Sequence, residues 1–201
     1  MDDVIEPVRL AADDLLLRPF LPSDAGAVFD ACQDLEIQQW TTVPVPYTRA
    51  NAEEFVASCG ERWASANPTF ACVDAASGRL LGAFDLQSCD AEEGPMVGFW
   101  VAPEARGEGV AVRAVQRMAR WAFDDLGLTR IRWAAFVGNV PSRRVADRAG
   151  FVMEGTCRRA LEQRGQRHDG WFASLLPEDL ELAVDGAELL RRRVPGWPYT
   201  P

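Results

Sequence analysis

The chain has 201 residues and a formal net charge of −9, with 48% hydrophobic and 25% charged residues. This is ordinary globular composition, and the acidic balance argues against nucleic acid as a partner because phosphate neutralisation needs a basic face. Its 21 cationic residues are all arginines and His168 is its single histidine, which excludes lysine-dependent mechanisms and most histidine metal sites.

The cysteines and the N-terminus indicate the compartment. The five cysteines are scattered and never form a C-x-x-C pair, so neither a zinc site nor a disulfide scaffold is expected. The first residues lack the cationic and apolar stretches of a signal peptide, and no segment reaches about 18 consecutive apolar residues. We therefore expect a cytoplasmic protein with no metal and no membrane contact.

The first half of the chain predicts a strand, two helices and a β-hairpin. The apolar run over 15–20 is typical of a strand, and a cap at its end starts a helix over 23–34. A proline-rich loop over 41–48 leads to a second helix over 48–65, which carries an apolar stripe. Residues 69–87 alternate as two strands joined by a tight turn.

The second half alternates strands with helices and ends in two strands. In chain order we expect a strand over 96–101, a helix over 110–126, a strand over 128–137, a helix over 139–150, and strands over 151–156 and 168–176. Residues 177–201 read as a helix and a Pro-rich tail, which leaves one domain over 1–176. This order predicts an α+β fold with a mixed sheet, since a doubly wound fold alternates strictly.

The stretch "VAPEARGEGVA", residues 101–111, joins a strand to the clearest helix. The first N–H groups of a helix have no partners within the helix and carry partial positive charge, and glycines let a ligand approach them. Gly107 and Gly109 therefore predict an anion site, most naturally for a phosphate. Arg106 is unfavourable at this helix end unless an anion lies close to it. The alternative is a tight turn with a solvated arginine.

Two nucleotide-binding motifs fail on detail. A P-loop needs a lysine after its second glycine, and the chain has none. A dinucleotide fingerprint needs a third glycine where Val112 stands, and it needs an acidic residue at the end of the next strand, which reads "AAFVGN".

The glycine stretch instead resembles the acyl-CoA pyrophosphate loop of the GNAT superfamily of N-acetyltransferases. The pattern [Q/R]-x-x-G-x-[G/A] falls on Arg106, Gly109 and Ala111. Two further motifs resemble the RimJ/RimL-like branch, which acetylates N-terminal amines of ribosomal proteins; they are Asn139, Ser142, Gly150 and Phe151, and then Gly165, His168 and Asp169. The opening "LLLRPF…SDA" is similar to that branch as well. The resemblance covers about 13–176.

This resemblance implies the GNAT fold, in which helices flank a central, mostly antiparallel twisted sheet whose strands splay at the acyl-CoA site. It also implies donor-binding residues. Backbone groups of Phe99, Trp100 and Val101 would bind pantetheine, and the amides of Gly107, Glu108, Gly109, Val110 and Ala111 would hold the pyrophosphate, with Arg106 nearby. Asn139 would bond the pantetheine arm, and Ser142 would lie near the thioester sulfur and protonate the leaving thiolate. Both residues could equally be plain helix caps.

Amines are protonated at neutral pH, so a base or a water chain must remove a proton. Some relatives carry a glutamate where Leu161 stands here, and the adjacent Glu162 is our candidate for that role. Because strand neighbours point to opposite faces, Glu162 would need a register shift of one residue to reach the acceptor. Asp85, Glu93 and water remain alternatives, and each acid could simply be solvated.

The acceptor would contact Trp40 and Tyr47, which lie in the proline-rich loop, while His168 and Asp169 would be structural. The resemblance thus predicts transfer of an acetyl group from acetyl-CoA to an amine, such as a protein N-terminus, by direct attack in a ternary complex. Three alternatives stay open: a small-molecule or antibiotic amine as acceptor, succinyl-CoA as donor, and a non-catalytic acyl-CoA sensor. Assembly into a homodimer is a further alternative that stays open.

Overall fold

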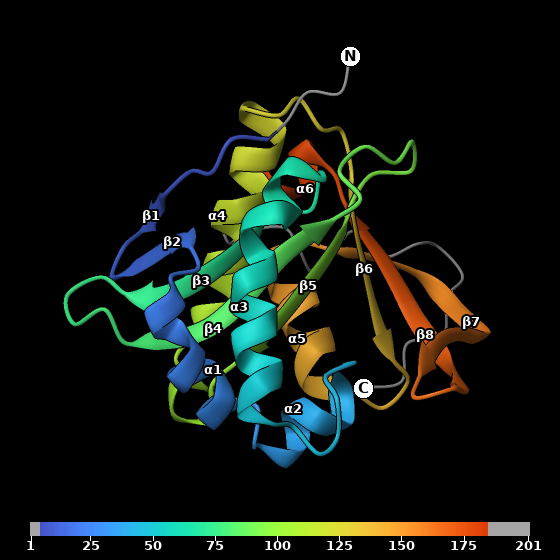
Figure 1. The fold of residues 1–201 in the computed structure, drawn as a ribbon. Helices are drawn as coiled ribbons and strands as arrows, with labels where there is room; N and C mark the ends of the chain where they lie inside the picture. The colour runs from blue at the N-terminus through green and yellow to red at the C-terminus, as the bar shows by residue number, and fades with distance from the viewer. Residues whose placement is uncertain (1–4, 185–201) are drawn as a thin grey trace.

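The computed structural model describes residues 5–184, which form one eight-stranded sheet with helices on both faces (Figure 1). The strand order is β1-β2-β3-β4-β5-β6-β8-β7. Neighbouring strands are antiparallel except for β5 and β6, which are parallel. The predicted α+β fold with a mixed, mostly antiparallel sheet is therefore confirmed.

The elements follow the order expected from the sequence, with additions at both ends. The strands are β1 (Leu10–Ala12), β2 (Leu15–Pro19), β3 (Thr69–Asp74), β4 (Leu80–Gln87), β5 (Met96–Val101), β6 (Ile131–Phe136), β7 (Val152–Gln163) and β8 (Gln166–Leu175). The α-helices are α1 (Ala25–Ala31), α2 (Leu35–Trp40), α3 (Arg49–Ala64), α4 (Val110–Asp124), α5 (Val140–Ala149) and α6 (Pro177–Val184), and short 3₁₀ turns η1 (Pro22–Asp24) and η2 (Pro103–Ala105) precede α1 and α4.

Two hydrophobic cores fix the layers. In Figure 1, α1 and α3 lie in front of the sheet, and α4 and α5 lie behind it. The front core gathers Val28, Ile37 and Val56 against the sheet. The larger rear core buries the apolar stripe of α4, where Val115 and Met118 are almost fully buried. Burying apolar side chains on both faces contributes most of the stabilisation and fixes each strand's register.

The first helix is shorter than expected because a second helix starts at Asp34. The side chain of Asp34 accepts a hydrogen bond from the backbone N–H of Ile37 at 2.9 Å, so it caps α2 instead of ending α1. No local pattern predicts α2, because the helix has only six residues and Ile37 is its one buried side chain. The predicted helix over 23–34 was therefore wrong beyond Ala31.

The "LLLRPF…SDA" motif has a structural explanation. Arg18 at the end of β2 donates two hydrogen bonds to the carboxylate of Asp24, at 2.8 and 2.9 Å. Both residues are buried, so this bidentate pair fixes the chain between β2 and α1.

Helix α6 packs against α4 and α5, and Leu180 enters the rear core. A side chain at Gly150 would meet Ala183 at 2.9 Å, which shows how closely α5 and α6 approach. The Pro-rich tail lies outside the described residues, and the boundary at residue 176 stays a prediction.

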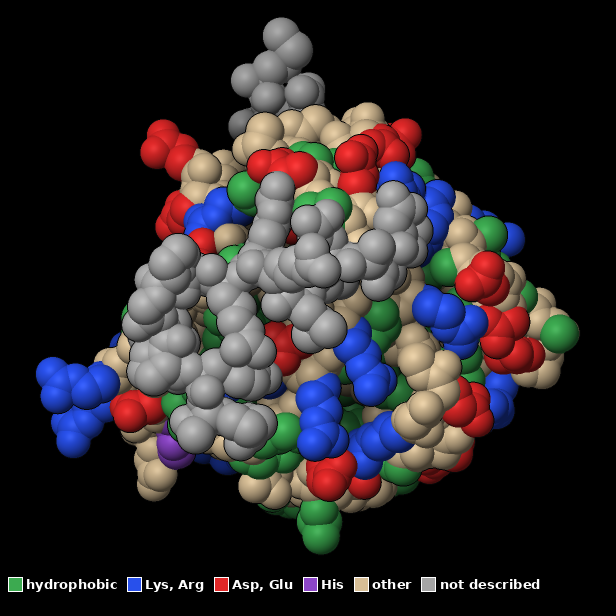
Figure 2. Space-filling model, turned by 180° about the vertical axis from the view of Figure 1, so that it is seen from behind, with side chains coloured by type: hydrophobic (Ala, Val, Ile, Leu, Met, Phe, Trp, Pro, Cys, Tyr) green, Lys and Arg blue, Asp and Glu red, His purple; other side chains and the backbone are tan. Residues whose placement is uncertain are grey.

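Acidic and basic side chains both lie on the surface of this chain, whose formal net charge is −9. On the side opposite to that of Figure 1, acidic and arginine side chains are interspersed (Figure 2).

Candidate functional site

Strands β5 and β6 begin side by side and then separate. They pair at two positions, Met96 with Arg132 and Val97 with Trp133, although each strand has six residues. The later residues of β5, Phe99 to Val101, remain paired with β4 on their other edge. Their backbone groups that face β6 therefore have no strand partner, which leaves them available to an extended ligand.

The glycine loop follows directly from this free edge. Gly107 and Gly109 have φ of 83° and 73°, the left-handed region that glycine tolerates, and a Cβ built on either would meet nothing within 4 Å. Gly109 is the N-cap of α4, and no side chain caps the helix. The first N–H groups of this 15-residue helix are thus uncapped, and the glycines beside them leave room for a ligand. Such an arrangement suits a phosphate.

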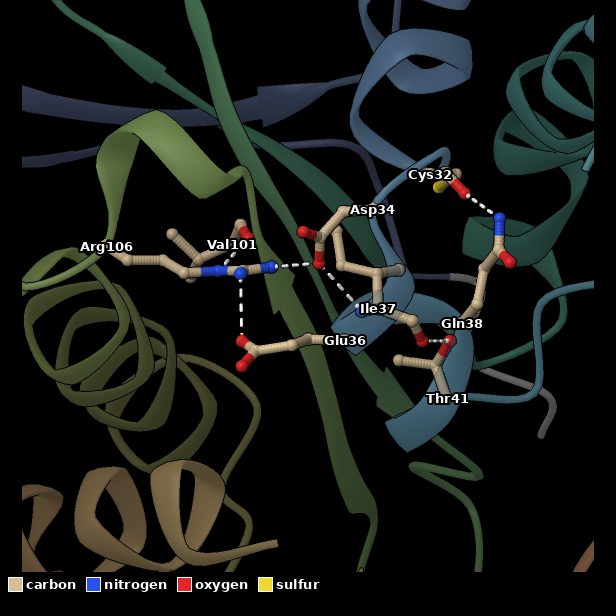
Figure 3. Close-up of polar contacts among 8 residues, drawn as sticks. All are labelled: Cys32, Asp34, Glu36, Ile37, Gln38, Thr41, Val101 and Arg106. Carbon is tan, nitrogen blue, oxygen red and sulfur yellow. Dashed lines mark hydrogen bonds and ion pairs between the residues drawn. The ribbon is translucent and has the colours of Figure 1, made fainter.

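Arg106 places a cation near the N-terminus of α4, and its hydrogen-bond partners explain how the charge is stabilised there. Its guanidinium donates to the carboxylates of Asp34 at 2.6 Å and Glu36 at 2.9 Å, and to the carbonyl of Val101 (Figure 3). The anions that balance Arg106 come from α2, so the arginine joins the glycine loop to that helix. Burial alone would raise the pKa of Asp34, but the hydrogen bonds from Arg106 and from the Ile37 N–H lower it below its usual value.

One cavity of about 980 Å³ contains the glycine loop and the free edge of β5. It continues across the front of the sheet beneath α3 to Asp85, and it is bounded by α2 and by β7. All of the predicted site residues line this cavity except Glu108, whose position in the loop is exposed. A cavity of this size is large enough for two substrates to meet.

Asn139 and Ser142 open α5 on the far side of the splay. The side chain of Asn139 accepts from the backbone N–H of Ser142 at 3.2 Å, so it is a helix cap, and this bond leaves its amide nitrogen available. The hydroxyl of Ser142 accepts a hydrogen bond from the indole N–H of Trp133 at 3.2 Å. Since that bond uses a lone pair of Oγ, the serine proton is left to be donated elsewhere.

Trp133 is a functional candidate that the sequence did not single out. It lies on β6 with 1% of its surface exposed, and alternation along the strand predicted it only as a core residue. Its indole N–H needs a partner when buried, and Ser142 supplies one.

Trp40 and Tyr47 have different environments. Trp40, at the end of α2, is partly exposed, and its ring lies 3.5 Å from where a Cβ on Gly138 would stand, next to Asn139. Tyr47 touches the cavity but is only 6% exposed, and its hydroxyl hydrogen-bonds with Cys32. Burial raises the pKa of Tyr47, which is typical of a core phenol.

A wide bulge in β7 sets the positions of Leu161 and Glu162. Cys157 pairs with Gly170 and Leu161 with His168, so two extra residues of β7 loop out, and Arg159 takes a positive φ of 51°. The backbone N–H of Arg159 donates to Asp169 at 2.9 Å, which supports the structural role expected for Asp169.

A one-residue bulge between Met153 and Gly155 precedes the wide bulge, so the two bulges together shift the register of β7 against β8 by three residues. Leu161 therefore packs over Gly170, on the face of the cavity. The carboxylate of Glu162 lies 3.3 Å from the guanidinium of Arg167, and both side chains are more than half exposed. Its role as a base stays a prediction.

Helix α2 is held at both ends. Arg106 binds its N-terminal carboxylates, and the β7–β8 turn binds its C-terminal carbonyls. The Gln163 amide donates to the carbonyls of Gln39 and Thr41, and the Arg164 guanidinium donates to those of Gln38 and Val43, at 2.6 to 2.9 Å. This helix thus forms a wall of the cavity that is tied to both the glycine loop and the last hairpin.

The sequence of residues 14–152 matches the model of the acetyltransferase (GNAT) domain family. The chain belongs to the GNAT family of N-acetyltransferases. YdaF of Bacillus subtilis, a protein named as a ribosomal N-acetyltransferase, is 36% identical to this GNAT protein over 105 residues. That alignment covers 52% of this chain and 57% of YdaF, so the match spans little more than half of the relative.

Solved structures share the fold. A GCN5-related N-acetyltransferase from Brucella melitensis superposes with a TM-score of 0.76 at 24% identity, covering 90% of this chain and 83% of that one. Mycobacterium smegmatis RimJ, solved with CoA-disulfide, superposes with a TM-score of 0.73 at 23% identity, covering 89% and 90%. The YdaF name agrees with the RimJ/RimL-like branch that the motifs predicted, and the solved structures show that the fold is shared.

Residues 5–184 contain neither a cluster of metal-ligating side chains nor a helix that could span a membrane. No group of three or more His, Cys, Asp or Glu side chains in this range is placed to hold a metal ion. None of the helices there combines the length and the apolar character that a membrane crossing requires.

Proposed function

We propose that this GNAT protein transfers an acetyl group from acetyl-CoA to a primary amine in a ternary complex, and that the amine is a protein N-terminus. The observation that carries the proposal is one continuous cavity, which joins the glycine loop and the free edge of β5 to a second half bounded by α2, α3 and β7. The name of YdaF supports a ribosomal-protein acceptor, and the RimJ structure with CoA-disulfide supports a CoA donor.

The donor half fits acetyl-CoA in three places. The amides at the start of α4 would bind the pyrophosphate, because they are uncapped and the left-handed glycines leave room for it. The free edge of β5 at Phe99–Val101 would bind pantetheine as a neighbouring strand would. The amide nitrogen of Asn139 would bond the same arm from the opposite side.

Ser142 would act where the thioester breaks. Trp133 holds Oγ through one lone pair, so the hydroxyl proton is free to bond to the departing sulfur. A donor bonded in this way is polarised by the indole N–H, which strengthens its own donation. Most of the rate enhancement would come from placing the amine against the thioester carbonyl.

Direct attack is supported by the state of the cysteines. Burial raises the pKa of Cys32 to about 11 and that of Cys59, Cys72 and Cys89 to about 12, so these thiols are poor nucleophiles at neutral pH. No cysteine stands among the residues that line the cavity in the described part of the chain. An acetyl-cysteine intermediate therefore has no evident site.

Thiol release from acetyl-CoA tests the proposal. Peptides with a free N-terminal amine, each matched with its N-acetylated copy, are compared with a polyamine, an aminoglycoside and succinyl-CoA as donor. We expect thiol release with a free peptide and none with its blocked copy. Release with a small amine alone would overturn the protein acceptor, and acetyl-CoA binding without release for any acceptor would overturn the enzyme.

A further inference from the structure

Asp85 and Gly98 form a feature of the cavity that donor binding does not explain. Asp85 lies on β4 and faces Gly98 of β5 across the sheet. Both residues line the cavity on its front side, and Asp85 is partly buried there. Since β5 is also the strand whose other edge is free for the donor, Asp85 stands one strand away from the expected thioester.

The absence of a side chain at Gly98 is a requirement of space. Gly98 is not in the left-handed region, so its backbone could be adopted by any residue, and glycine weakens a strand interior. A Cβ at this position would stand 2.4 Å from Oδ1 of Asp85 and 3.0 Å from the amide nitrogen of Gln87. The carboxylate of Asp85 therefore lies over Gly98, in the space that a side chain at this position would fill.

The carboxylate keeps capacity for a further donor. It accepts a hydrogen bond from the Gln87 amide at 3.1 Å and one from the backbone of Gly98, while two carboxylate oxygens offer about four acceptor sites. Arg62 of α3 contributes positive charge nearby, but its guanidinium stacks over the ring of Phe55 at 5.3 Å. Among the described residues it forms no ion pair with Asp85 within 4 Å.

We propose that the Asp85 carboxylate, which lies over Gly98 and lines the cavity, is the amine subsite of the acceptor half, and that it binds a primary alkylammonium group and removes its proton. The inference rests on the proposed function and deepens it, because it names the substrate class and the residue that the amine touches.

The step balances without another reactant. The ammonium gives one proton to the Asp85 carboxylate and becomes a neutral amine. The amine nitrogen bonds to the thioester carbon as the C–S bond breaks, and the electron pair leaves on sulfur. The second nitrogen proton neutralises the thiolate through Ser142, and Asp85 returns its proton to solvent.

The surroundings of Asp85 suit this role. Burial raises the pKa of Asp85 above its usual range, although the Gln87 amide and Arg62 oppose the change, so it is a stronger base than a solvated carboxylate. The other titratable groups near it are Cys59 and Arg62 on α3, Cys89 after β4, and Glu54 on the cavity wall. Burial raises the pKa of both thiols to about 12, so neither competes at neutral pH.

The experiment compares wild type, Asp85→Asn and the matched control Asp90→Asn, whose side chain is exposed outside the cavity. The acceptor is the peptide with the highest rate in the thiol-release panel, and kcat/KM is measured across pH. Wild type binds the ammonium through the ionised Asp85, so the acid limb of its pH profile should reflect the ionisation of that carboxyl group. Asp85→Asn must capture the neutral amine, so its acid limb should move to the pKa of the peptide amine, about 8, with about 10²-fold lower kcat/KM at pH 7.

Asp90→Asn should superpose on wild type, and calorimetry should give the same acetyl-CoA affinity for all three proteins. Gly98→Ala is a second variant, expected to raise the acceptor KM at least about tenfold because its Cβ would displace the Asp85 carboxylate. Overlapping pH profiles for Asp85→Asn and wild type would overturn the inference while leaving the enzyme intact. Should Asp85→Asn not fold, an unchanged acceptor KM in Gly98→Ala would overturn it instead. If wild type acetylates nothing, the proposed function fails and the amine subsite fails with it.

Discussion

The proposed donor and acceptor halves of the cavity are built in different ways. The donor half comes from one continuous stretch, residues 99–111, with Asn139 and Ser142 added from the start of α5. Most of its binding groups are backbone amides and carbonyls. The acceptor half is assembled from side chains on α2, α3, β4, β5 and β7, which lie far apart in the chain.

This difference determines which changes of side chain each half of the cavity can accept. A backbone site depends on where side chains are absent, so few positions define it and glycines mark them. A side-chain site depends on how distant elements pack, so its chemistry can change while the fold stays the same. The donor should therefore be fixed by a local motif, and the acceptor by tertiary contacts such as those that hold α2.

The largest effect on acetyl-CoA binding should follow from a substitution in the glycine loop. Gly109→Val places a side chain where the pyrophosphate approaches and should weaken acetyl-CoA binding about 10²-fold, since charged hydrogen bonds of about 1.5–3 kcal/mol each are lost. The matched control is Gly78→Val in the β3–β4 turn, with φ of 74° against 73° and equally open space.

Both substitutions should lower the free energy of unfolding by about 1–2 kcal/mol through the left-handed backbone. Calorimetric titration with acetyl-CoA should separate them. Equal affinity in the two folded variants would show that the glycine loop does not bind the donor.

Removing the Ser142 hydroxyl should have the next largest effect. Ser142→Ala should lower kcat about tenfold to a hundredfold with a smaller change in the donor KM, because a thiolate leaves readily even without an acid. An unchanged kcat would leave Ser142 with a capping role only.

Trp133→Phe should lower kcat about threefold to tenfold by releasing the Ser142 hydroxyl, and it should have no further effect on kcat when Ser142 is already alanine. This double-mutant cycle separates positioning from loss of packing, since a packing defect would persist in the alanine background. Thermal unfolding of all four proteins provides the control.

A moderate effect on stability and on the acceptor KM is expected from Asp34, whose contact with Arg106 joins α2 to the glycine loop. Asp34→Asn keeps the helix cap, because asparagine caps as well as aspartate, but it removes the charge that faces Arg106. We expect a loss of about 0.5–1 kcal/mol in unfolding free energy at pH 7 and a severalfold higher acceptor KM as α2 loosens. Asp34→Ala should cost about 1 kcal/mol more, since it also loses the cap.

The pH dependence of this contact has a defined sign. The pKa of Asp34 is lowered in the folded protein, so its stabilising contribution is present above the unfolded pKa of about 3.9 and is lost as pH falls through the folded value. The stability difference between wild type and Asp34→Asn should therefore shrink in denaturant titrations at pH 3. A constant difference between pH 7 and pH 3 would contradict the ion pair.

The smallest effect should come from Glu162→Gln. With the carboxylate ion-paired to Arg167 in solvent, we expect kcat/KM to change by less than about threefold across pH. A large drop with a flattened acid limb would instead make Glu162 the base and would weaken the case for Asp85.

Much of the fold was predictable because its patterns are local. The stripe of α4, the alternation of β6 and the Asn139 and Gly150 boundaries of α5 each follow from neighbours in sequence, and the structure confirms them. Helix α2 was missed because its start depends on one cap and its position on Arg106, Gln163 and Arg164, which are far away in the chain.

The site divides in the same way. The motif pointed to the glycine loop as the proposed donor site, but it did not show that Arg106 forms ion pairs with α2. Nothing in "RRALEQRG" required the bulge that places Leu161 over Gly170. In the sequence, Gly98 is simply a glycine within a predicted strand. Its contact with Asp85 depends on the pairing of β4 with β5, which the local sequence does not specify.

The most direct test of the account is an initial-rate study in which acetyl-CoA and the best peptide acceptor are varied together. A cavity that holds both substrates at once predicts reciprocal plots that intersect, with no thiol release before the acceptor is added. Parallel plots together with a burst of thiol and an acetylated enzyme would show a covalent intermediate and would contradict direct transfer in one shared cavity.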